Sequence, residues 1–369
     1  MHVGLDVRMW HHTGIGRYIR ALVRHLPGHG VSLTVWGPPA ILAEPALDGC
    51  ARRECDLPVH SLAEQATLPR DIARSGVELF HSPHLNLPLL GDFQRVVTIH
   101  DLIPLHHPET LSWAGRQYFR AMATVLAPRK ANRVLTVSEW TRADLIAHGV
   151  SPEHVVAVPL GVEPAFAAPL PDATLWRHLD TLGVRPPFIL YAGQQKAYKN
   201  LAILVDAFAD LLARHDGTRP RPSLVLLGRP DARSGLTEWI EGKGLGDAIV
   251  CPGYLADEEA VVALFQAARC FAFPSLCEGF GLPPLEAMAA GTPVVCSDRT
   301  PLAETAGRAA FLVDPHDVLE WSRALEQALW QEERRSQAIR AGRLRAAQFS
   351  WDRTISATID VYREALVRV

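Results

Sequence analysis

The strongest constraint on the fold is an alternation of short apolar runs with amphipathic helical stretches, which occurs twice along the chain. A helical stretch between two apolar runs predicts a parallel β-α-β unit, because parallel strands are covered by helices on both faces. The first series ends near residue 158, and the second begins at Phe188. The segment 164–187 between them contains five prolines. We therefore expect two doubly wound, Rossmann-like α/β domains, at 1–165 and 188–350, joined by a linker at 166–187.

The expected strands are rich in β-branched and other apolar residues. They lie at 3–7, 31–36, 79–81, 96–100, 134–137 and 155–158 in the first domain, and at 188–191, 223–227, 248–251, 271–273 and 293–296 in the second. The clearest helices are expected at 16–26, 141–148, 200–214, 257–269, 284–290, 315–330 and 351–367. Ser138 has the character of an N-cap for the second of these helices, and Gly149 of its C-terminal stop.

Composition and charge exclude several classes of protein. Of the 369 residues, 48% are hydrophobic and 21% charged, which is typical of a folded soluble chain with enough residues for two cores. The net charge of −3 argues against a globally basic nucleic-acid-binding protein. No apolar run reaches the roughly 18 residues of a membrane span. The six cysteines fit no zinc spacing, and the first residues do not resemble a signal peptide, so we expect a cytoplasmic protein.

The most informative segment, 273–288, reads FPSLCEGFGLPPLEAM. A strand ends, a glycine-containing loop follows, and prolines stand where a helix begins. The backbone N–H groups of Gly279, Phe280, Gly281 and Leu282, together with the helix dipole, are suited to a phosphate. Glu278 and Glu286 flank this site and can accept hydrogen bonds from sugar hydroxyls. A site for both a phosphate and a sugar suggests a nucleotide sugar; the alternative is an ordinary strand-turn-helix with surface glutamates.

Two further loops follow strands and carry residues suited to phosphate. The segment 191–200, YAGQQKAYKN, places Lys196 and Lys199 where they can neutralise a leaving diphosphate, although a solvated turn is the alternative. The segment 13–18, TGIGRY, carries Gly14 and Gly16 but has Ile19 where a dinucleotide fingerprint needs a third glycine. A nicotinamide-dependent oxidoreductase is therefore poorly supported, and a tight strand-helix turn remains open.

Histidines at two strand ends of the first domain are candidates for substrate contacts. His100 and Asp101 end the expected strand 96–100, where they can orient a substrate hydroxyl or act as acid and base. His81, His84 and Asn86 end another strand, and we expect them, together with Asp101, on the side of the acceptor substrate. A lone histidine at a strand end is also commonly a structural residue.

The segment 273–288 resembles the Glu-x7-Glu signature of the retaining glycosyltransferases of family 4, also called group 1, which have the GT-B fold of two domains facing across a cleft. The resemblance implies that Glu278 contacts the donor hexose, that Glu286 holds the ribose, and that Gly14 and Gly16 form a flexible loop facing the donor phosphates. It also places His100 beside the transferred sugar and implies that a C-terminal helix, 351–369, packs back on the first domain.

The resemblance further implies how the reaction proceeds. The segments 80–83, 99–102 and 137–139 resemble bacterial polysaccharide and O-antigen mannosyltransferases, which makes GDP-mannose the first expectation for the donor. The acceptor is expected to be a glycan, a lipid-linked molecule or a small molecule. No Asp-x-Asp motif occurs, so we expect a reaction that needs no metal, with His100, Lys199 and Glu278 as catalytic residues.

Other interpretations stay open at this point. A GT-B epimerase or hydrolase acting on nucleotide sugars shares the expected architecture but lacks this Glu-x7-Glu pattern. A two-lobed sugar-binding protein would need no phosphate loop. The segment 111–133 is basic and aromatic without an acidic residue, which suits peripheral contact with the inner face of an anionic membrane or, alternatively, a helix packed on the sheet with a solvated basic face.

Overall fold

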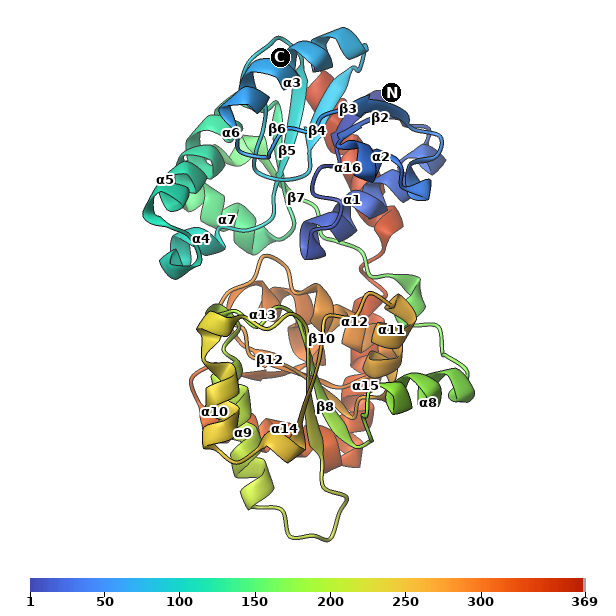
Figure 1. Ribbon diagram of the computed structural model, residues 1–369, viewed down its shortest axis with the longest axis vertical. Helices are drawn as coiled ribbons and strands as arrows, with labels where there is room; N and C mark the ends of the chain where they lie inside the picture. Colours follow the sequence, from blue (N-terminus) through green and yellow to red (C-terminus); the bar gives the residue numbers. More distant parts are fainter. Residues whose placement is uncertain (368–369) are drawn as a thin grey trace. The chain divides into compact units, whose positions relative to one another are not determined.

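The computed structural model describes residues 1–367, including every side chain in that range except those of Leu62, Arg233 and Thr300. The chain forms two compact units, which Figure 1 shows as two separate sheets with their helices. The first unit comprises Met1–Gly161 and the residues from Ser350 onward, and the second comprises Val162–Phe349. Within the described range, no helix combines the length and the apolar character needed to cross a membrane.

The expected linker at 166–187 is instead part of the second unit. Its helix α8 (Asp172–Thr181) packs against α11 (Glu258–Ala267). The ring of Phe166 is buried edge-on to the ring of Phe265, with 5.1 Å between their centroids. Pro164, just before this segment, begins a short helical turn, and Pro171 is the N-cap residue of α8, so this part of the chain is folded rather than extended. The boundary therefore lies at Gly161–Val162, a few residues before the expected position.

The first unit is built on a seven-stranded parallel sheet in the order β3-β2-β1-β4-β5-β6-β7. The strands are β1 (His2–Asp6), β2 (Ser32–Gly37), β3 (Ala51–Glu54), β4 (Leu79–Ser82), β5 (Gln94–Ile99), β6 (Arg133–Thr136) and β7 (Val155–Ala157). The strand order reverses between β1 and β4. The edge strand β3 was not expected, because its sequence, ARRE, is charged and exposed.

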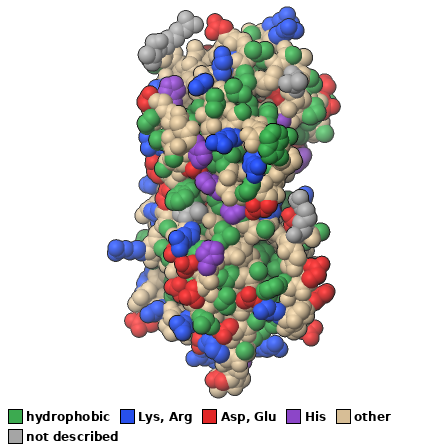
Figure 2. All heavy atoms as spheres, turned by 90° about the vertical axis from the view of Figure 1, so that its left-hand side faces the viewer, with side chains coloured by type: hydrophobic (Ala, Val, Ile, Leu, Met, Phe, Trp, Pro, Cys, Tyr) green, Lys and Arg blue, Asp and Glu red, His purple; other side chains and the backbone are tan. Residues whose placement is uncertain are grey.

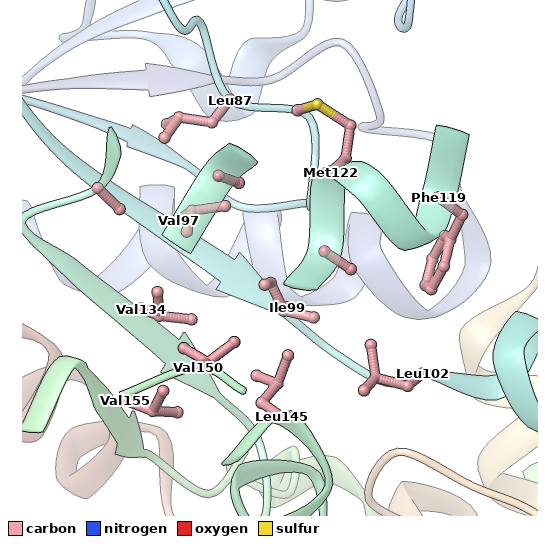
Figure 3. Close-up of a cluster of buried hydrophobic side chains, with 13 residues drawn as sticks. Leu87, Val97, Ile99, Leu102, Phe119, Met122, Val134, Leu145, Val150 and Val155 are labelled. Atoms are coloured by element: carbon pink, nitrogen blue, oxygen red, sulfur yellow. The ribbon is translucent and has the colours of Figure 1, made fainter. Parts of the chain in front are cut away.

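Helices cover this sheet on both faces. They are α1 (Thr13–His25), α2 (Pro39–Leu42), α3 (Leu62–Ser75), α4 (Ile103–His106), α5 (Trp113–Ala121), a π-helical turn (Met122–Leu126), α6 (Ala127–Lys130), α7 (Glu139–Ala147) and α16 (Trp351–Leu366). Ser138 caps α7 by accepting a hydrogen bond from the Thr141 N–H at 3.1 Å, and Gly149 follows in the left-handed conformation. Figure 3 shows Val97, Ile99 and Leu145 within the hydrophobic core of the unit.

The C-terminal helix α16 lies in the first unit, where Figure 1 shows it in red among the blue and cyan elements. Its buried face includes Trp351, Ile355 and Tyr362. The Thr354 hydroxyl donates a hydrogen bond to the Pro159 carbonyl oxygen at 2.7 Å, which fixes the start of the helix against the end of the first segment. An amphipathic helix buries its apolar stripe against a sheet face, and here α16 contacts β4, β5 and β6.

The second unit has a six-stranded parallel sheet in the order β10-β9-β8-β11-β12-β13. The strands are β8 (Phe188–Ala192), β9 (Ser223–Leu227), β10 (Ile249–Gly253), β11 (Cys270–Phe273), β12 (Val294–Ser297) and β13 (Phe311–Val313). Besides α8 and α11, its helices are α9 (Leu201–Ala213), α10 (Leu236–Gly242), α12 (Leu282–Ala290), α13 (Thr300–Ala306), α14 (Val318–Trp330) and α15 (Glu332–Ala346). The strand order reverses between β8 and β11.

The two reversals position the candidate sites. In a parallel sheet all carboxyl ends lie at one edge, and the loops on either side of a reversal point leave in opposite directions. The crevice between such loops is where open α/β sheets bind ligands. In the first unit this crevice lies at the ends of β1 and β4, and in the second unit at the ends of β8 and β11.

Candidate active site

The reversal point of the second unit brings together Lys199 and Glu278, two residues that the sequence predicts for the donor site. Lys199 follows β8 and Glu278 follows β11. The Lys199 Nζ donates a hydrogen bond to Glu278 Oε1 at 2.5 Å, and the two side chains are only 11% and 10% exposed. The Leu276 N–H donates to the Tyr198 carbonyl oxygen at 2.9 Å, so the two loops are also joined through their backbones.

Aromatic rings lie close to the Lys199 ammonium. The Lys199 Nζ lies 5.2 Å from the ring centroid of Tyr198 and 5.2 Å from that of Phe273. Tyr191 stacks on Phe273 with 5.7 Å between centroids, and its hydroxyl donates to the Gln194 carbonyl oxygen at 2.8 Å. Burial raises the pKa of Tyr191 well above its usual range, so this hydroxyl stays protonated. The rings attract the ammonium and exclude water, which strengthens its interaction with an anion.

The helix α12 begins at the same site. Gly281 precedes it with a φ of 95°, and a Cβ at this position would lie 2.6 Å from Leu302 Cδ2, so both conformation and space require glycine. Pro283 and Pro284 occupy the first turn and have no N–H, which leaves the N–H groups of 279–282 as the donors near the helix start. The Thr305 hydroxyl donates to the Phe280 carbonyl oxygen at 2.6 Å and holds this loop.

The structure gives the remaining residues of this segment different environments. Glu286 lies in the second turn of α12 and is buried. Phe280 is also buried, and its ring packs edge-on to Phe349 with 5.7 Å between centroids. The Phe280 side chain is therefore a packing residue, and its backbone is the part suited to a donor molecule.

Lys196 borders a pocket of about 250 Å³ at the carboxyl ends of β8 and β9. The pocket is lined by Gln194, Gln195, Lys196, Arg229, Pro230, Asp231 and Ala232. Sequence reasoning missed Arg229, whose guanidinium lies 4.8 Å from the ring centroid of Tyr254. The signal was present, because Gly228 and Arg229 directly follow an apolar strand. A Cβ on Gly228 would lie 1.9 Å from the Gly193 carbonyl oxygen, so the two loops pack backbone against backbone.

His100 follows β5 in the first unit, as expected. Its Nε2–H donates a hydrogen bond to the Pro83 carbonyl oxygen at 2.9 Å. Burial lowers the pKa of His100 to about 4, so the imidazole is neutral near pH 7 and Nδ1 is its hydrogen-bond acceptor. A neutral imidazole of this kind suits contact with a substrate hydroxyl rather than proton donation. The neighbouring Asp101 accepts the Ile103 N–H at 3.0 Å, a local turn at the start of α4.

The expectation that His81, His84 and Asn86 face an acceptor is corrected by the structure. His81 and Asn86 are fully buried, and His84 is 2% exposed. His81 lies between two buried hydroxyls, and burial lowers its pKa to about 3. The His84 Nε2–H donates to Asp6 Oδ2 at 3.1 Å, and its Nδ1 accepts the Asn86 N–H at 3.2 Å. Their polar atoms are used inside the unit, so these residues hold the strand end together.

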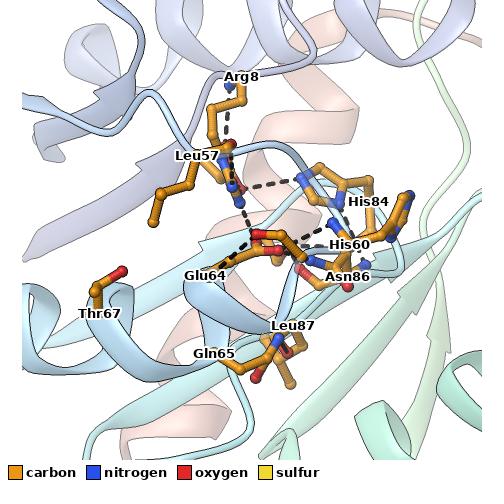
Figure 4. Close-up of polar contacts among 12 residues, drawn as sticks. Arg8, Leu57, His60, Glu64, Gln65, Thr67, His84, Asn86 and Leu87 are labelled. Carbon is orange, nitrogen blue, oxygen red and sulfur yellow. Dashed lines mark hydrogen bonds and ion pairs between the residues drawn. The ribbon is translucent and has the colours of Figure 1, made fainter.

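His84 and Asn86 belong to a buried network that sequence reasoning did not find. Arg8 forms ion pairs with Asp6 and Glu64, at 2.5 Å for the Asp6 Oδ2 contact, and Asn86 Nδ2 donates to Glu64 Oε2 at 2.5 Å. Figure 4 shows Arg8 after β1, Glu64 on α3, and His84 and Asn86 on the loop after β4 converging on one another. Although burial alone would raise the pKa of Asp6, Arg8 and His84 hold it well below its usual range. The network lies at the β1–β4 reversal point.

Gly14 and Gly16 also differ from the expectation of a flexible loop. Both lie in the first turns of α1. A Cβ on Gly16 would lie 2.2 Å from the Trp10 carbonyl oxygen, so this glycine is required by close backbone packing. Gly14 has open space around its Cα, and a donor contact there remains a prediction.

The segment 111–133 forms a helical surface. Trp113 is 71% exposed, and Leu126 lies in its exposed part. The exposed basic residues Arg120, Arg129 and Lys130 belong to the same segment. Figure 2 shows hydrophobic and basic side chains interspersed on the face of the first unit that it presents. The buried side of the segment, with Phe119 and Met122, packs in the hydrophobic core. One side of the segment therefore packs inward, and the other side carries cations and apolar groups; contact with a membrane stays a prediction.

Comparisons with known families cover almost the whole chain. The family described as "Glycosyl transferases group 1" matches residues 177–345, and the family described as "Glycosyltransferase Family 4" matches residues 12–166. The first of these matches contains Lys199, Glu278 and Glu286, and the second contains His100.

Individual proteins agree with these families. O-antigen chain mannosyltransferase B of Escherichia coli is 31% identical over 291 residues, covering 77% of this chain and 74% of that protein. D-inositol 3-phosphate glycosyltransferase of Acidothermus cellulolyticus is 28% identical, covering 96% and 86%. The crystal structure of Anabaena HepE in complex with UDP and glucose has a TM-score of 0.79 at 19% identity, covering 98% of this chain and 99% of that one.

Proposed function

Because the chain belongs to the group 1 glycosyltransferases of family 4 and has their GT-B fold, we propose that it transfers a hexose from a nucleotide diphosphate sugar to a hydroxyl group with retention of configuration. The observation that carries this proposal is the Lys199–Glu278 pair, held at the strand-order reversal of the second sheet beside the start of α12. A cation, a set of backbone N–H groups and a carboxylate meet there, which is the chemistry that a diphosphate and a sugar require together.

Each group has a proposed role in donor binding. The Lys199 ammonium and the N–H groups of 279–282 bind the diphosphate and stabilise the charge that develops as it leaves. The Glu278 carboxylate accepts hydrogen bonds from the hexose hydroxyls once the diphosphate has taken over Lys199. Glu286, on the following turns of α12, accepts from the ribose hydroxyls. His100, neutral and with Nδ1 as acceptor, contacts a hydroxyl of the transferred sugar.

The reaction is proposed to take place on one face of the sugar. The bond between the anomeric carbon and the phosphate oxygen breaks, the bond to the acceptor oxygen forms, and the acceptor proton passes to the departing phosphate oxygen. In this account Glu278 binds the hexose hydroxyls rather than the anomeric carbon, so we propose front-face attack instead of a covalent enzyme intermediate. Lys199 and the helix start supply the positive charge, and we propose that no metal is required.

GDP-mannose is the proposed donor, supported by the mannosyltransferase among the relatives. The acceptor is proposed to be a glycan, lipid-linked or small-molecule hydroxyl. A thermal-shift comparison of GDP, UDP, ADP and TDP tests the donor, since a ligand that binds only the folded state raises the melting temperature. We expect the largest shift with GDP. A larger shift with another diphosphate would overturn the choice of base while leaving the transferase proposal intact.

We also propose that the exposed side of 111–133 contacts the inner face of an anionic membrane. Trp113 and Leu126 supply apolar contacts, and Arg120, Arg129 and Lys130 supply positive charge. Sedimentation with phosphatidylglycerol vesicles tests this contact. We expect binding that falls on Trp113→Ser or on adding salt, and equal binding to neutral phosphatidylcholine vesicles would contradict it.

A further inference from the structure

A chain of buried hydrogen bonds joins the C-terminal helix to the surroundings of His100. The Tyr362 hydroxyl on α16 lies 2.7 Å from His81 Nδ1, and His81 Nε2 lies 2.8 Å from the Thr98 hydroxyl. The Thr98 hydroxyl lies 3.3 Å from the Tyr18 hydroxyl, which also bonds to Thr358 on α16. The first four of these side chains, on α16, β4, β5 and α1, are at most 2% exposed. The two ends of this series of hydrogen bonds, Tyr362 and Thr358, therefore both lie on α16.

The hydrogen-bonding capacity of each group sets one direction for this chain. The Thr358 hydroxyl donates to a backbone carbonyl one turn earlier in α16, at 2.7 Å, so it accepts the Tyr18 proton. Tyr18 in turn accepts from Thr98, and Thr98 accepts the Nε2–H of His81. His81 Nδ1 then accepts the Tyr362 proton. Burial lowers the pKa of His81 to about 3, which keeps its imidazole neutral, as this arrangement requires. Every buried donor is used once.

The Tyr18 ring connects these hydrogen bonds to His100 by packing against its imidazole. The ring lies edge-on to the His100 imidazole, with 5.2 Å between centroids and an interplanar angle of 83°. It also lies edge-on to His81, at 6.1 Å and 78°. Because the Tyr18 hydroxyl is bonded on two sides, the ring cannot shift away from His100 without breaking these hydrogen bonds. The hydrogen bond from the His100 imidazole to the Pro83 carbonyl oxygen is a further restraint on this ring.

We propose that Tyr362 and Tyr18 are positioning residues that hold the His100 imidazole in place for contact with the transferred sugar. This inference rests on the proposed function, in which His100 touches the donor. Tyr362 acts through His81 and Thr98, and Tyr18 acts directly on the His100 ring. In this account α16 is part of the support of the active site, although none of its residues touches substrate.

Tyr362→Phe tests the inference, because it removes one hydroxyl and keeps the ring. We measure kcat and the donor KM from release of the nucleoside diphosphate from GDP-mannose, or from the nucleotide sugar selected by the thermal-shift comparison. Misplacing a group that acts in the transition state lowers kcat, so we expect a loss of about tenfold with the donor KM within about twofold. Tyr18→Phe should have the same effect, and the double variant should be no worse than Tyr18→Phe alone, because both act through one chain.

Ile355→Val is the matched control, since Ile355 is buried on α16 but lies outside the hydrogen-bond chain. We expect it to lower the melting temperature while keeping the wild-type kcat. Additive losses in Tyr18→Phe and Tyr362→Phe, or an equal loss of kcat in Ile355→Val, would indicate a general effect of stability and overturn the inference. The His100→Ala variant distinguishes the proposed role of His100 from the proposed positioning role of Tyr362. A wild-type kcat in His100→Ala would refute the proposed role of His100, whereas an inactive His100→Ala beside a fully active Tyr362→Phe would refute positioning alone.

NMR spectroscopy tests the series of buried hydrogen bonds independently of any activity assay. Nitrogen–proton NMR of the imidazole groups distinguishes the two neutral tautomers, with signals assigned by the His81→Gln and His100→Ala variants. We expect His81 and His100 both to carry the proton on Nε2 at pH 7. In Tyr362→Phe the His81 Nδ1 signal should shift toward that of an unbonded nitrogen. A proton on Nδ1 of His81 in the wild-type protein would reverse the chain and overturn the inference.

Discussion

The ion pair between Lys199 and Glu278 makes an opposite prediction for each partner. The Lys199 ammonium and the Glu278 carboxylate neutralise each other at 2.5 Å, with both side chains about nine-tenths buried. A diphosphate must therefore compete with Glu278 for Lys199. Glu278 becomes available to the sugar only after that exchange. Replacing Lys199 should act on diphosphate binding, and replacing Glu278 should act on the sugar.

The magnitudes follow from the contacts that are lost. Lys199→Ala removes a charge-assisted hydrogen bond to phosphate, worth about 1.5–3 kcal/mol, so the nucleoside diphosphate should bind roughly 10- to 150-fold more weakly. The unpaired Glu278 carboxylate would add repulsion. Glu278→Ala frees the ammonium, so the diphosphate should bind at least as tightly as to the wild type. Loss of the sugar contact should lower kcat on the order of 100-fold.

Isothermal titration calorimetry with GDP measures the affinities, and diphosphate release from GDP-mannose measures kcat. Glu278→Gln is the matched control, because it keeps the shape of the side chain and removes its charge. It should follow Glu278→Ala in diphosphate affinity. Equal GDP affinity in the wild type and in both alanine variants would refute this division of roles.

Three further predictions concern metal dependence, the effect of pH on stability, and the role of α16. EDTA should leave turnover nearly unchanged, because Lys199 and the start of α12 supply the positive charge; turnover abolished by EDTA and restored by manganese would contradict this. Burial lowers the pKa of His81 from 6.5 to about 3, so below pH 6.5 the unfolded chain binds more protons and stability falls as the pH drops. Urea unfolding at pH 7 and pH 5 should show a loss of about 2 kcal/mol from this residue alone, and equal stability at the two pH values would refute it. Truncation after Phe349 removes α16, and we expect exposed apolar surface, detectable by dye binding, with loss of turnover; wild-type stability and turnover would show that the helix is dispensable.

The strands with the clearest sequence signal lie inside the sheets and are buried on both faces. A strand such as β8 or β11 is covered by helices on each side, so nearly every residue is apolar and the run stands out. The edge strand β3 pairs on one side only, and its sequence, ARRE, gives no apolar signal. The linker expectation failed for a related reason. Pro171 stands at the N-cap of α8, a position compatible with packing, and nothing local shows that Phe166 finds a partner about 100 residues later.

The donor-side pair was predictable because its position follows from topology. Lys199 and Glu278 are separated by 79 residues, yet each follows a strand at the reversal point, where the loops of a parallel sheet meet. The histidines were not predictable in the same way. His81 stands at a strand end like His100, but its partner Tyr362 lies 281 residues later, on the last helix. Sequence pattern alone does not distinguish a histidine enclosed by hydroxyls from one available to a ligand.

The buried network of the first unit shows the same limit. Asp6 ends β1 and Arg8 lies two residues later, which is a signal for a site at the reversal point. Their partner Glu64 lies near the start of α3, where its N–H bonds to the Ser61 hydroxyl at 3.2 Å as in an ordinary helix cap. The Glu64 carboxylate turns instead to Arg8. Local sequence explains the cap, and only the fold explains the ion pair.

The most direct test of the central claim is incubation of the protein with GDP-mannose labelled in the sugar, together with a membrane and glycan extract as a source of acceptors. The account predicts that label moves from the nucleotide to acceptor material while GDP is released in equal amount. It also predicts that Glu278→Ala slows both on the order of 100-fold, although this variant still binds GDP. The same experiment extends to UDP-, ADP- and TDP-hexoses, any of which would support a transferase with another donor. Absence of sugar transfer from every nucleotide sugar, or full transfer by Glu278→Ala, would contradict the proposed site.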